Sequence, residues 1–412
     1  MDIVYRCCCG IDVHQGTVAV CALLWGDGGK VERDKRIYGT TTGELRDLAT
    51  WLQQKGVTHI AMEATGVYWE PVWNVLEQHA NWELMLVNPE HCKAIRGKKT
   101  DLKDGQRIGE LLQHGLLNGS FVPSTEIRAL RDLTRYRTRL QQNRATLSNR
   151  IQKFLEKGNI KLGCVASDVL GLSGRAMLAR LSEGEQDPDK LANLACGRLR
   201  GKPDQLRAAL EGCLADHHRF LLKEMLADLK HVEDEVGRVE EQIRNRMQPY
   251  EDHLRRLETI KGVNRVTAWT LIAEMGPNMQ QFPSAGHLAS WAGICPGNNE
   301  SAGKRRSGKT RPGNRWLRRA ICEAAWASAH SKNTYLSVQF KRLALRRGSK
   351  RALIAVAHTI LVIAWHVLSR NCDYQDLGAD FFDRGHEQQL TKRLVRRLEQ
   401  LGHNVNLTPA AQ

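Results

Sequence analysis

The chain of 412 residues lacks the cysteine patterns of a disulfide framework or a zinc site. Its eleven cysteines include a run at positions 7–9, but no two stand in a Cys-x-x-Cys arrangement. No secretory segment precedes the first apolar run. These absences exclude a small secreted disulfide-rich protein, and they predict free thiols in a reducing cytoplasm.

The sequence also lacks an uninterrupted apolar run long enough to span a membrane. The most apolar stretch, residues 352–368, is slightly short for a span and is interrupted by His358 and His366. We therefore expect a buried helix, in which both histidines are core residues and not metal ligands. No membrane partner is expected.

Acidic residues are nearly absent from residues 301–370, where sixteen Lys or Arg stand against the single acid Glu323. Because the formal net charge of the chain is +16, almost all of its excess charge lies in this segment. A localised basic region most often binds a phosphate backbone. A disordered loop is the alternative for its first part, since Gly, Ser, Lys and Arg are typical of such loops.

The first 123 residues alternate strand and helix patterns, which predicts an α/β domain. Strands are expected at residues 8–13, 17–24, 31–38, 59–63 and 83–87, and helices at 42–55, at 68–79 and from residue 100. Thr42 and Thr100 are the candidate N-caps of the first and last of these helices.

Four carboxylates fall at the ends of these elements. Asp12 stands between Ile11 and Val13 in the first strand, Glu63 ends a later strand, and Asp101 and Asp104 open a helix. In an α/β sheet such ends gather at one edge, so the four side chains can converge. Converging carboxylates hold two Mg²⁺ ions that polarise a phosphodiester. For the helical pair, a solvated first turn screened by neighbouring Lys and Arg is the plainer alternative.

From about residue 125 the pattern becomes helical. Apolar residues recur every seven positions in two segments, at 133, 140, 147 and 154 and at 222, 229, 236 and 243. Such repeats predict long coiled-coil helices, which pair either within the chain as a hairpin or between two copies in a dimer.

Three short motifs carry a resemblance to a known family: Gly10-Ile-Asp12-Val-His, Met62-Glu63-Ala-Thr-Gly66 and Thr100-Asp101-Leu-Lys-Asp104. Their order and spacing resemble the Asp-Glu-Asp-Asp signature of the bridge-RNA-guided insertion-sequence transposases, relatives of the Piv invertase. The resemblance implies an RNase H-like (RuvC-like) fold, similar to Holliday-junction resolvases, for the N-terminal domain. It also implies that Asp12, Glu63, Asp101 and Asp104 are catalytic metal ligands.

The same family carries a serine before a Gly-Lys step in its C-terminal transposase domain, and Ser301 stands at that position. Many relatives read Ser-Gly-Gly-Lys where this chain has Ser-Ala-Gly-Lys, so Ser307 is kept as a weaker candidate. A serine hydroxyl must be activated by a base or a metal before it attacks. The cations expected to contact nucleic acid are Lys304, Arg305, Arg306, Lys309, Arg311, Arg315, Arg318 and Arg319.

These observations predict four parts: an RNase H-like catalytic domain (1–123), a coiled-coil helical linker (124–256), a mostly α C-terminal transposase domain with the catalytic serine (257–370), and a basic helix with a polar tail (371–412). The resemblance implies a bacterial cytoplasmic enzyme that excises and inserts a mobile element. It implies donor and target DNA, a structured guide RNA, a homo-oligomer (dimer or tetramer), Mg²⁺ and a serine–DNA intermediate. The alternatives are a metal-dependent junction nuclease without a covalent step and a non-enzymatic basic nucleic-acid-binding protein.

Overall fold

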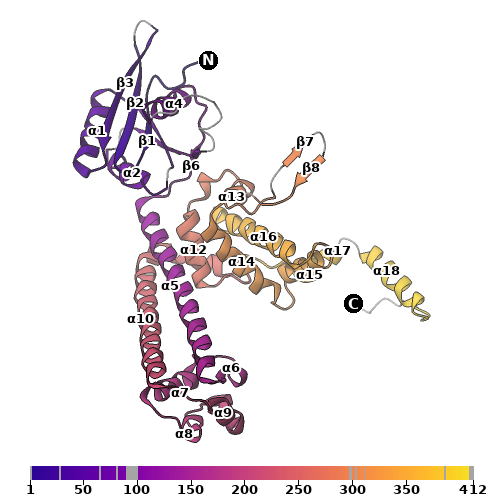
Figure 1. Cartoon of the computed structure of the whole chain (residues 1–412). Helices are drawn as coiled ribbons and strands as arrows, with labels where there is room; N and C mark the ends of the chain where they lie inside the picture. The colour runs from indigo at the N-terminus through magenta and orange to yellow at the C-terminus, as the bar shows by residue number, and fades with distance from the viewer. Residues whose placement is uncertain are drawn as a thin grey trace. The chain divides into compact units, whose positions relative to one another are not determined.

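The computed structural model describes residues 2–26, 29–64, 66–79, 82–89, 101–296, 299–301, 304–310, 312–384 and 387–407. At residues 101–102, 299–301, 304–307, 383 and 387–390 the description covers the backbone only. The chain forms two compact units, Met1–Val122 and Pro123–Gln412 (Figure 1). The predicted N-cap Thr100 and the cation Arg311 lie outside the described residues.

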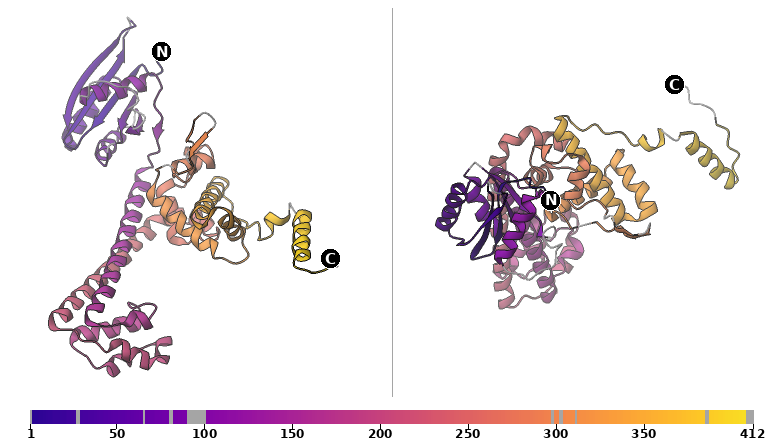
Figure 2. Two further views of the ribbon diagram at one scale, coloured as in Figure 1. Left: turned by 45° about the vertical axis from the view of Figure 1, so that its right-hand side comes forward. Right: turned by 90° about the horizontal axis from the view of Figure 1, so that it is seen from above.

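The N-terminal unit is built on a six-stranded mixed sheet in the order β3-β2-β1-β4-β5-β6. Figure 2 shows the unit in two further views. Its strands are β1 (Cys7–Val13), β2 (Thr17–Trp25), β3 (Val31–Gly39), β4 (His59–Glu63), β5 (Glu83–Val87) and β6 (Gly119–Ser120). The first three strands form an antiparallel meander, β4 and β5 run parallel to β1, and β6 is antiparallel to β5. The five predicted strands are confirmed. The sequence pattern missed β6, because a two-residue strand has no periodicity.

Helices cover both faces of this sheet. On one face α1 (Thr42–Gln54) and α2 (Trp69–Glu77) share an apolar core with alternate residues of β1, β2 and β4. On the other face lies α4 (Asp101–Gln113), whose Ile108 and Leu112 pack against Cys8, Ala61 and Val87. The α/β class predicted for this unit is confirmed.

The N-cap of α1 differs by one residue from the prediction. The hydroxyl of Thr41, not that of Thr42, accepts a hydrogen bond from the backbone N–H of Glu44. The carboxylate of Glu44 in turn accepts from the backbone N–H of Gly39 at 3.1 Å and from the hydroxyl of Thr41 at 2.6 Å. This reciprocal capping satisfies backbone donors before the first turn and sets where α1 begins.

The C-terminal unit begins with two long helices that pack side by side, α5 (Thr125–Leu155) and α10 (Asp216–Met247). Ion pairs between Arg137 and Glu240 and between Arg144 and Glu233 show that the helices run antiparallel. All four α10 repeat positions, 222, 229, 236 and 243, are buried. The structure therefore contains the intramolecular hairpin, one of the two arrangements that the repeats allow.

Shorter elements connect the two long helices and follow them in the sequence. Between the two long helices lie α6 (Leu162–Val165), α7 (Leu172–Glu183), α8 (Pro188–Ala192) and α9 (Pro203–Leu210). After them come α11 (Glu251–Glu258), α12 (Arg265–Met275), α13 (Ala285–Trp291), β7 (Asn299–Ser301), β8 (Lys304–Ser307), α14 (Arg315–Ala329), α15 (Tyr335–Arg347), α16 (Ser349–Arg370), α17 (Phe381–Arg384) and α18 (Glu387–Gln400). The boundary predicted after residue 256 falls inside α11, which packs against α12 and α16.

Helix α16 is strongly apolar along its 22 residues. It is long and apolar enough to cross a membrane, with a mean hydropathy of 2.0 over its best window, of which 44% is buried in the protein. A core helix passes the same test of length and composition. Its buried residues, such as Val356 and Ile360, pack among α13, α14 and α15. Burial lowers the pKa of His358 and His366, which favours neutral rings at both positions.

Candidate active site and nucleic-acid interface

Asp12 is a nearly buried carboxylate near the end of β1, 6% exposed. Its neighbours Ile11 and Val13 belong to the core beneath α1 and α2, so strand alternation turns Asp12 to the face that α4 covers. Oδ2 of Asp12 lies 3.3 Å from Nε2 of His14, just beyond the strand. A carboxylate is costly in such surroundings unless a cation or hydrogen-bond donors compensate it.

Glu63 ends β4, the parallel neighbour of β1. The register pairs Gly10 with Ala61 and Ile11 with Met62, so the next step along both strands brings Asp12 beside Glu63. Register partners in neighbouring strands point to the same face of the sheet and lie about 5 Å apart. The two carboxylates therefore come from neighbouring positions at the same end of adjacent strands.

Three glycines bring α4 against the sheet. A Cβ atom on Gly10 of β1 would lie 2.1 Å from the backbone nitrogen of Gly109 and 2.2 Å from the carbonyl oxygen of Gly105. Near the start of α4, Gly105 lies against Ala19, which is the register partner of Asp12. At the end of α4, the backbone carbonyl of Gln113 accepts a hydrogen bond from the N–H of Val4, which precedes β1. Helix α4 thus runs antiparallel to β1. Its first turn lies at the Asp12 end of that strand.

The predicted acids therefore come from elements that end at one edge of the sheet. Asp104, in the first turn of α4, has a half-buried side chain, whereas at Asp101 only the backbone is described. Among the side chains that the structure describes, no three His, Cys, Asp or Glu residues form a cluster able to hold a metal ion. The backbone arrangement places Asp12 beside Glu63 and directs the first turn of α4 toward the same edge, and the coordination of a metal by the four acids stays a prediction.

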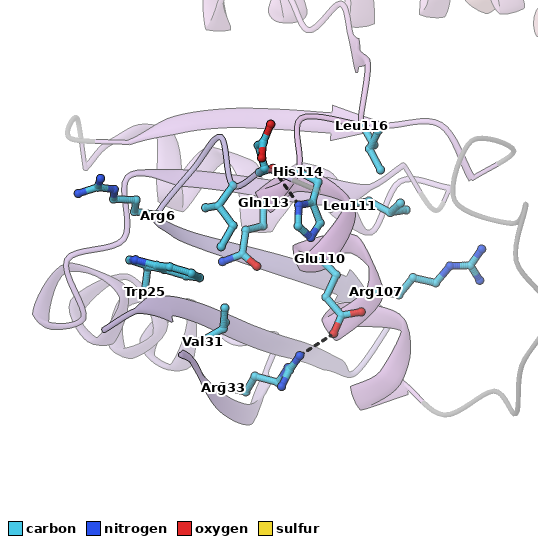
Figure 3. A pocket seen from close by; sticks show the side chains of 12 residues that line it. Arg6, Trp25, Val31, Arg33, Arg107, Glu110, Leu111, Gln113, His114 and Leu116 are labelled. Atoms are coloured by element: carbon cyan, nitrogen blue, oxygen red, sulfur yellow. Dashed lines mark hydrogen bonds and ion pairs between the residues drawn. The ribbon is translucent and has the colours of Figure 1, made fainter. Parts of the chain in front are cut away.

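A pocket of about 730 Å³ lies at the other end of α4 (Figure 3). It is bounded by the N-terminal segment, by the β2–β3 end with Trp25 and Arg33, and by the C-terminal half of α4. Arg33 reaches across to Glu110, with Nη2 3.4 Å from Oε1, and Nδ1 of His114 lies 3.0 Å from the carbonyl oxygen of Asp2. None of the four predicted acids lines this pocket, so the hollow is separate from them.

Ser301 lies in the C-terminal unit at the end of β7, where it pairs with Lys304 of β8. The same antiparallel hairpin pairs Asn299 with Ser307, and a bridge between Pro296 and Thr310 closes its base. A disordered loop is the alternative prediction for this segment, whereas the structure forms a β-hairpin here. Its backbone places Lys304, Arg305 and Arg306 on the strand opposite Ser301, and the directions of these side chains are outside the description.

The remaining predicted cations flank or belong to α14. Lys309 and Arg315 are exposed. Nη1 of Arg318 donates to the carbonyl oxygen of Gly293 at 3.3 Å, and Nε of Arg319 donates to Glu323 at 2.8 Å. Arg318 therefore has a structural contact that holds α14 to the turn after α13.

A second group of charged residues, which the sequence patterns above did not predict, lies on α5 and α12. Glu274 of α12 is fully buried and accepts hydrogen bonds from Arg135 of α5 and from the side-chain amide of Asn314, the N-cap of α14. Nε of Arg131 lies 3.2 Å from the same carboxylate. Arginines at positions 128, 131, 135 and 139 recur at the spacing of one helix face. This periodicity is the sequence signal that could have predicted a basic face on α5.

Comparison with known proteins supplies the class of the enzyme. Residues 9–160 match a family described as transposase, and residues 254–341 match the transposase IS116/IS110/IS902 family. The chain is 24% identical over 376 residues to the transposase for insertion sequence element IS1111A of Coxiella burnetii, covering 89% of this chain and 90% of that protein. It is 25% identical over 323 residues to a probable family 20 transposase of Pseudomonas aeruginosa, covering 77% of this chain and 85% of the relative.

A third relative, a putative transposase y4pF/y4sB of Sinorhizobium fredii, is 23% identical over 338 residues, with 80% of this chain and 78% of the relative covered. These matches and the two family ranges define a DNA transposase. The two ranges together cover more than half of the chain. The first spans most of the N-terminal unit and continues into α5, and the second lies in the C-terminal unit. The chain belongs to the IS110/IS116 family of transposases.

Proposed function

We propose that this transposase excises and inserts an insertion-sequence element by using the carboxylates of its N-terminal unit together with Ser301. The strand order β3-β2-β1-β4-β5, with an antiparallel meander followed by two parallel strands, supports an RNase H-like (RuvC-like) fold for this unit. The catalytic carboxylates in this proposal are Asp12, Glu63, Asp101 and Asp104.

One observation carries the proposal. The glycine contact between α4 and β1 brings the first turn of α4 to the edge where β1 and β4 end. This packing supports a site in which carboxylates from three segments distant in sequence act together. A solvated surface would not require Asp12 to be nearly buried.

The donor set fits Mg²⁺, because carboxylate oxygens are the ligands that this hard cation prefers and Asp12 is nearly buried. Asp12, Glu63, Asp101 and Asp104 would hold it, with two ions expected. When bound, Mg²⁺ neutralises charge on the phosphodiester and orients it. His14, 3.3 Å from Asp12, contributes by holding the Asp12 carboxylate in place.

The proposed covalent step belongs to Ser301. Its hydroxyl oxygen forms a bond to the scissile phosphorus, its proton passes to a base, and the bond from phosphorus to the leaving strand oxygen breaks as that oxygen takes up a proton. The result is a phosphoserine-linked strand, which keeps the end attached for rejoining. Cations on β8 and in the following segment would stabilise charge on the phosphoryl oxygens.

The acids and Ser301 belong to different compact units. One active site built from both therefore requires the units to meet, within one protomer or between protomers of a dimer or tetramer. We further infer that a structured guide RNA selects donor and target DNA. The resemblance described above is the support for this inference, because base pairing can supply sequence specificity that the protein does not need to read.

Adduct formation tests the serine role. With labelled donor DNA, guide RNA and Mg²⁺, the unmodified protein should form a protein–DNA adduct that survives denaturing electrophoresis. Ser301→Ala should abolish the adduct, and Ser307→Ala, at the other end of the same hairpin, is the matched control that should retain it. An adduct that persists in Ser301→Ala would assign the attack to another residue. Efficient cleavage without any adduct in the unmodified protein would favour the junction-nuclease alternative.

A further inference from the structure

Trp316, in the first turn of α14, is surrounded by three guanidinium groups. The guanidinium carbon of Arg315 lies 4.8 Å from the centre of its ring, that of Arg139 lies 5.7 Å away, and that of Arg135 lies 5.8 Å away. Arg135 and Arg139 come from α5, more than 170 positions earlier in the chain. Arginine stacks on aromatic faces in this way and keeps its N–H edges available.

The arginines around Trp316 carry more positive charge than the nearby carboxylate can neutralise. Glu274 is its buried carboxylate, and Arg131, Arg135 and Asn314 already contact it. In the part of the chain that the structure describes, no ion pair joins Arg139 or Arg315 to a carboxylate, and both side chains are exposed. Two like charges held beside one ring repel each other, and a bound anion relieves that repulsion.

The group also lies at the base of the Ser301 hairpin. Gly313, two residues before Arg315, packs so closely that a Cβ atom would lie 2.5 Å from the backbone nitrogen of Gly293. Arg318 donates to the carbonyl oxygen of the same Gly293. Gly313 and Arg318 therefore hold the start of α14 against the turn that precedes the hairpin.

We propose that Arg139 and Arg315 form a binding site for the sugar-phosphate backbone of a nucleic acid, with Trp316 as the positioning residue that orients both guanidinium groups. This inference rests on the proposed function, because it assumes a nucleic-acid partner for this unit, and it extends the interface onto α5. Two arginine forks match the geometry of phosphate oxygens, which they contact bidentately. Removing one such charged hydrogen-bonding group lowers affinity by about tenfold.

The test measures binding of the full-length protein to labelled duplex DNA, single-stranded DNA and single-stranded RNA between 50 and 200 mM salt. With six or more phosphate contacts across the whole basic surface, the unmodified protein should lose about 10³-fold or more in affinity over this range. Arg139→Gln should weaken binding about tenfold at low salt and reduce the slope of log affinity against log salt by about 1. Arg150→Gln, an exposed arginine on the same helix, removes the same charge away from the site and should have neither effect.

Trp316 is tested with two variants. Trp316→Leu should weaken binding in the same way as Arg139→Gln, and Trp316→Phe should recover most of the affinity because an aromatic face remains. Thermal unfolding of each variant shows whether it is folded. A loss of affinity confined to RNA or to DNA would identify which backbone the site holds, and either result supports the site.

Equal affinity and equal salt slope in Arg139→Gln and Arg150→Gln would overturn the proposal and leave the Arg–Trp contacts a purely structural role. The adduct assay separates this failure from failure of the proposed function. If Arg139→Gln binds normally while Ser301 forms the adduct, only the present inference is wrong. If Arg139→Gln selectively weakens binding while no adduct forms, the backbone site stands and the serine mechanism is wrong.

Discussion

The carboxylate of Glu274 on α12 accepts hydrogen bonds from Nε and Nη2 of Arg135 on α5, at 2.7 and 2.8 Å. Because Glu274 is fully buried, this paired contact joins the long helical hairpin to the helices that carry the Ser301 hairpin. Arg131 shares the carboxylate, and burial lowers the pKa of Arg131 to about 10 while Glu274 opposes that shift.

Glu274→Gln should destabilise the protein by about 3 kcal/mol or more, because two arginines would then lose their buried counter-charge. The measurement is thermal unfolding together with urea unfolding. Glu240→Gln is the matched control, since Glu240 pairs with Arg137 on the same hairpin but is 29% exposed. The control should cost less than about 1 kcal/mol. Similar losses in the two variants would contradict the role given to the buried pair.

Gly10→Ala should destabilise the N-terminal unit by about 3 kcal/mol, because the added methyl group would meet the backbone of Gly105 and Gly109 and neither can move without lifting α4 from the sheet. Gly43→Ala in the first turn of α1 meets no atom within 4 Å and should be neutral or stabilising by up to about 1 kcal/mol. Circular dichroism during heating measures both. An unchanged midpoint in Gly10→Ala would show that the close packing of α4 is not required.

Metal binding should depend on the carboxylates at the sheet edge. Isothermal titration of the full chain with Mn²⁺ or Mg²⁺ should show binding that Asp12→Asn and Asp104→Asn abolish, because each removes a charged oxygen ligand. Asp47→Asn, an exposed acid of α1, removes the same charge elsewhere in the unit and should bind as the unmodified protein does. Unchanged binding in both site variants would remove the acids from the metal site.

Glu233 should make the stability of the packing between α10, α5 and α7 depend on pH. Both terminal nitrogens of Arg175 donate to Glu233 at 2.6 Å, and Arg175 foremost, with Arg144, lowers the pKa of Glu233 below its ordinary value of 4.5. A lowered pKa in the folded state means that this stability is present above the unfolded-state pKa and is lost as pH falls through the folded-state value.

The melting temperatures of the unmodified protein and Glu233→Gln should therefore differ most near neutral pH and converge below about pH 4.5. Glu224→Gln, an exposed position on the same helix, should show no such convergence. A difference that stays constant with pH would indicate that packing, not charge, accounts for the Glu233 effect.

Local pattern was sufficient for much of the fold. The ranges of β4 and β5 agree with the predicted residues 59–63 and 83–87, because short apolar runs between turn residues have few other conformations available. The helical C-terminal region followed from heptad spacing in the same way. The two-residue β6 could not be predicted, because its existence depends on pairing with Leu86 and Val87 and not on its own residues.

The sequence by itself determined the family and which acids and which serine deserve testing, because short motifs and helix or strand periodicity depend only on neighbouring residues. Only the tertiary structure decided that α4 lies antiparallel against β1, so that Asp104 and Asp12 belong to elements meeting at one sheet edge. It likewise decided that arginines of α5 surround Trp316 of α14. Such contacts join residues far apart in the chain, and their geometry depends on how whole elements pack, which no local pattern records.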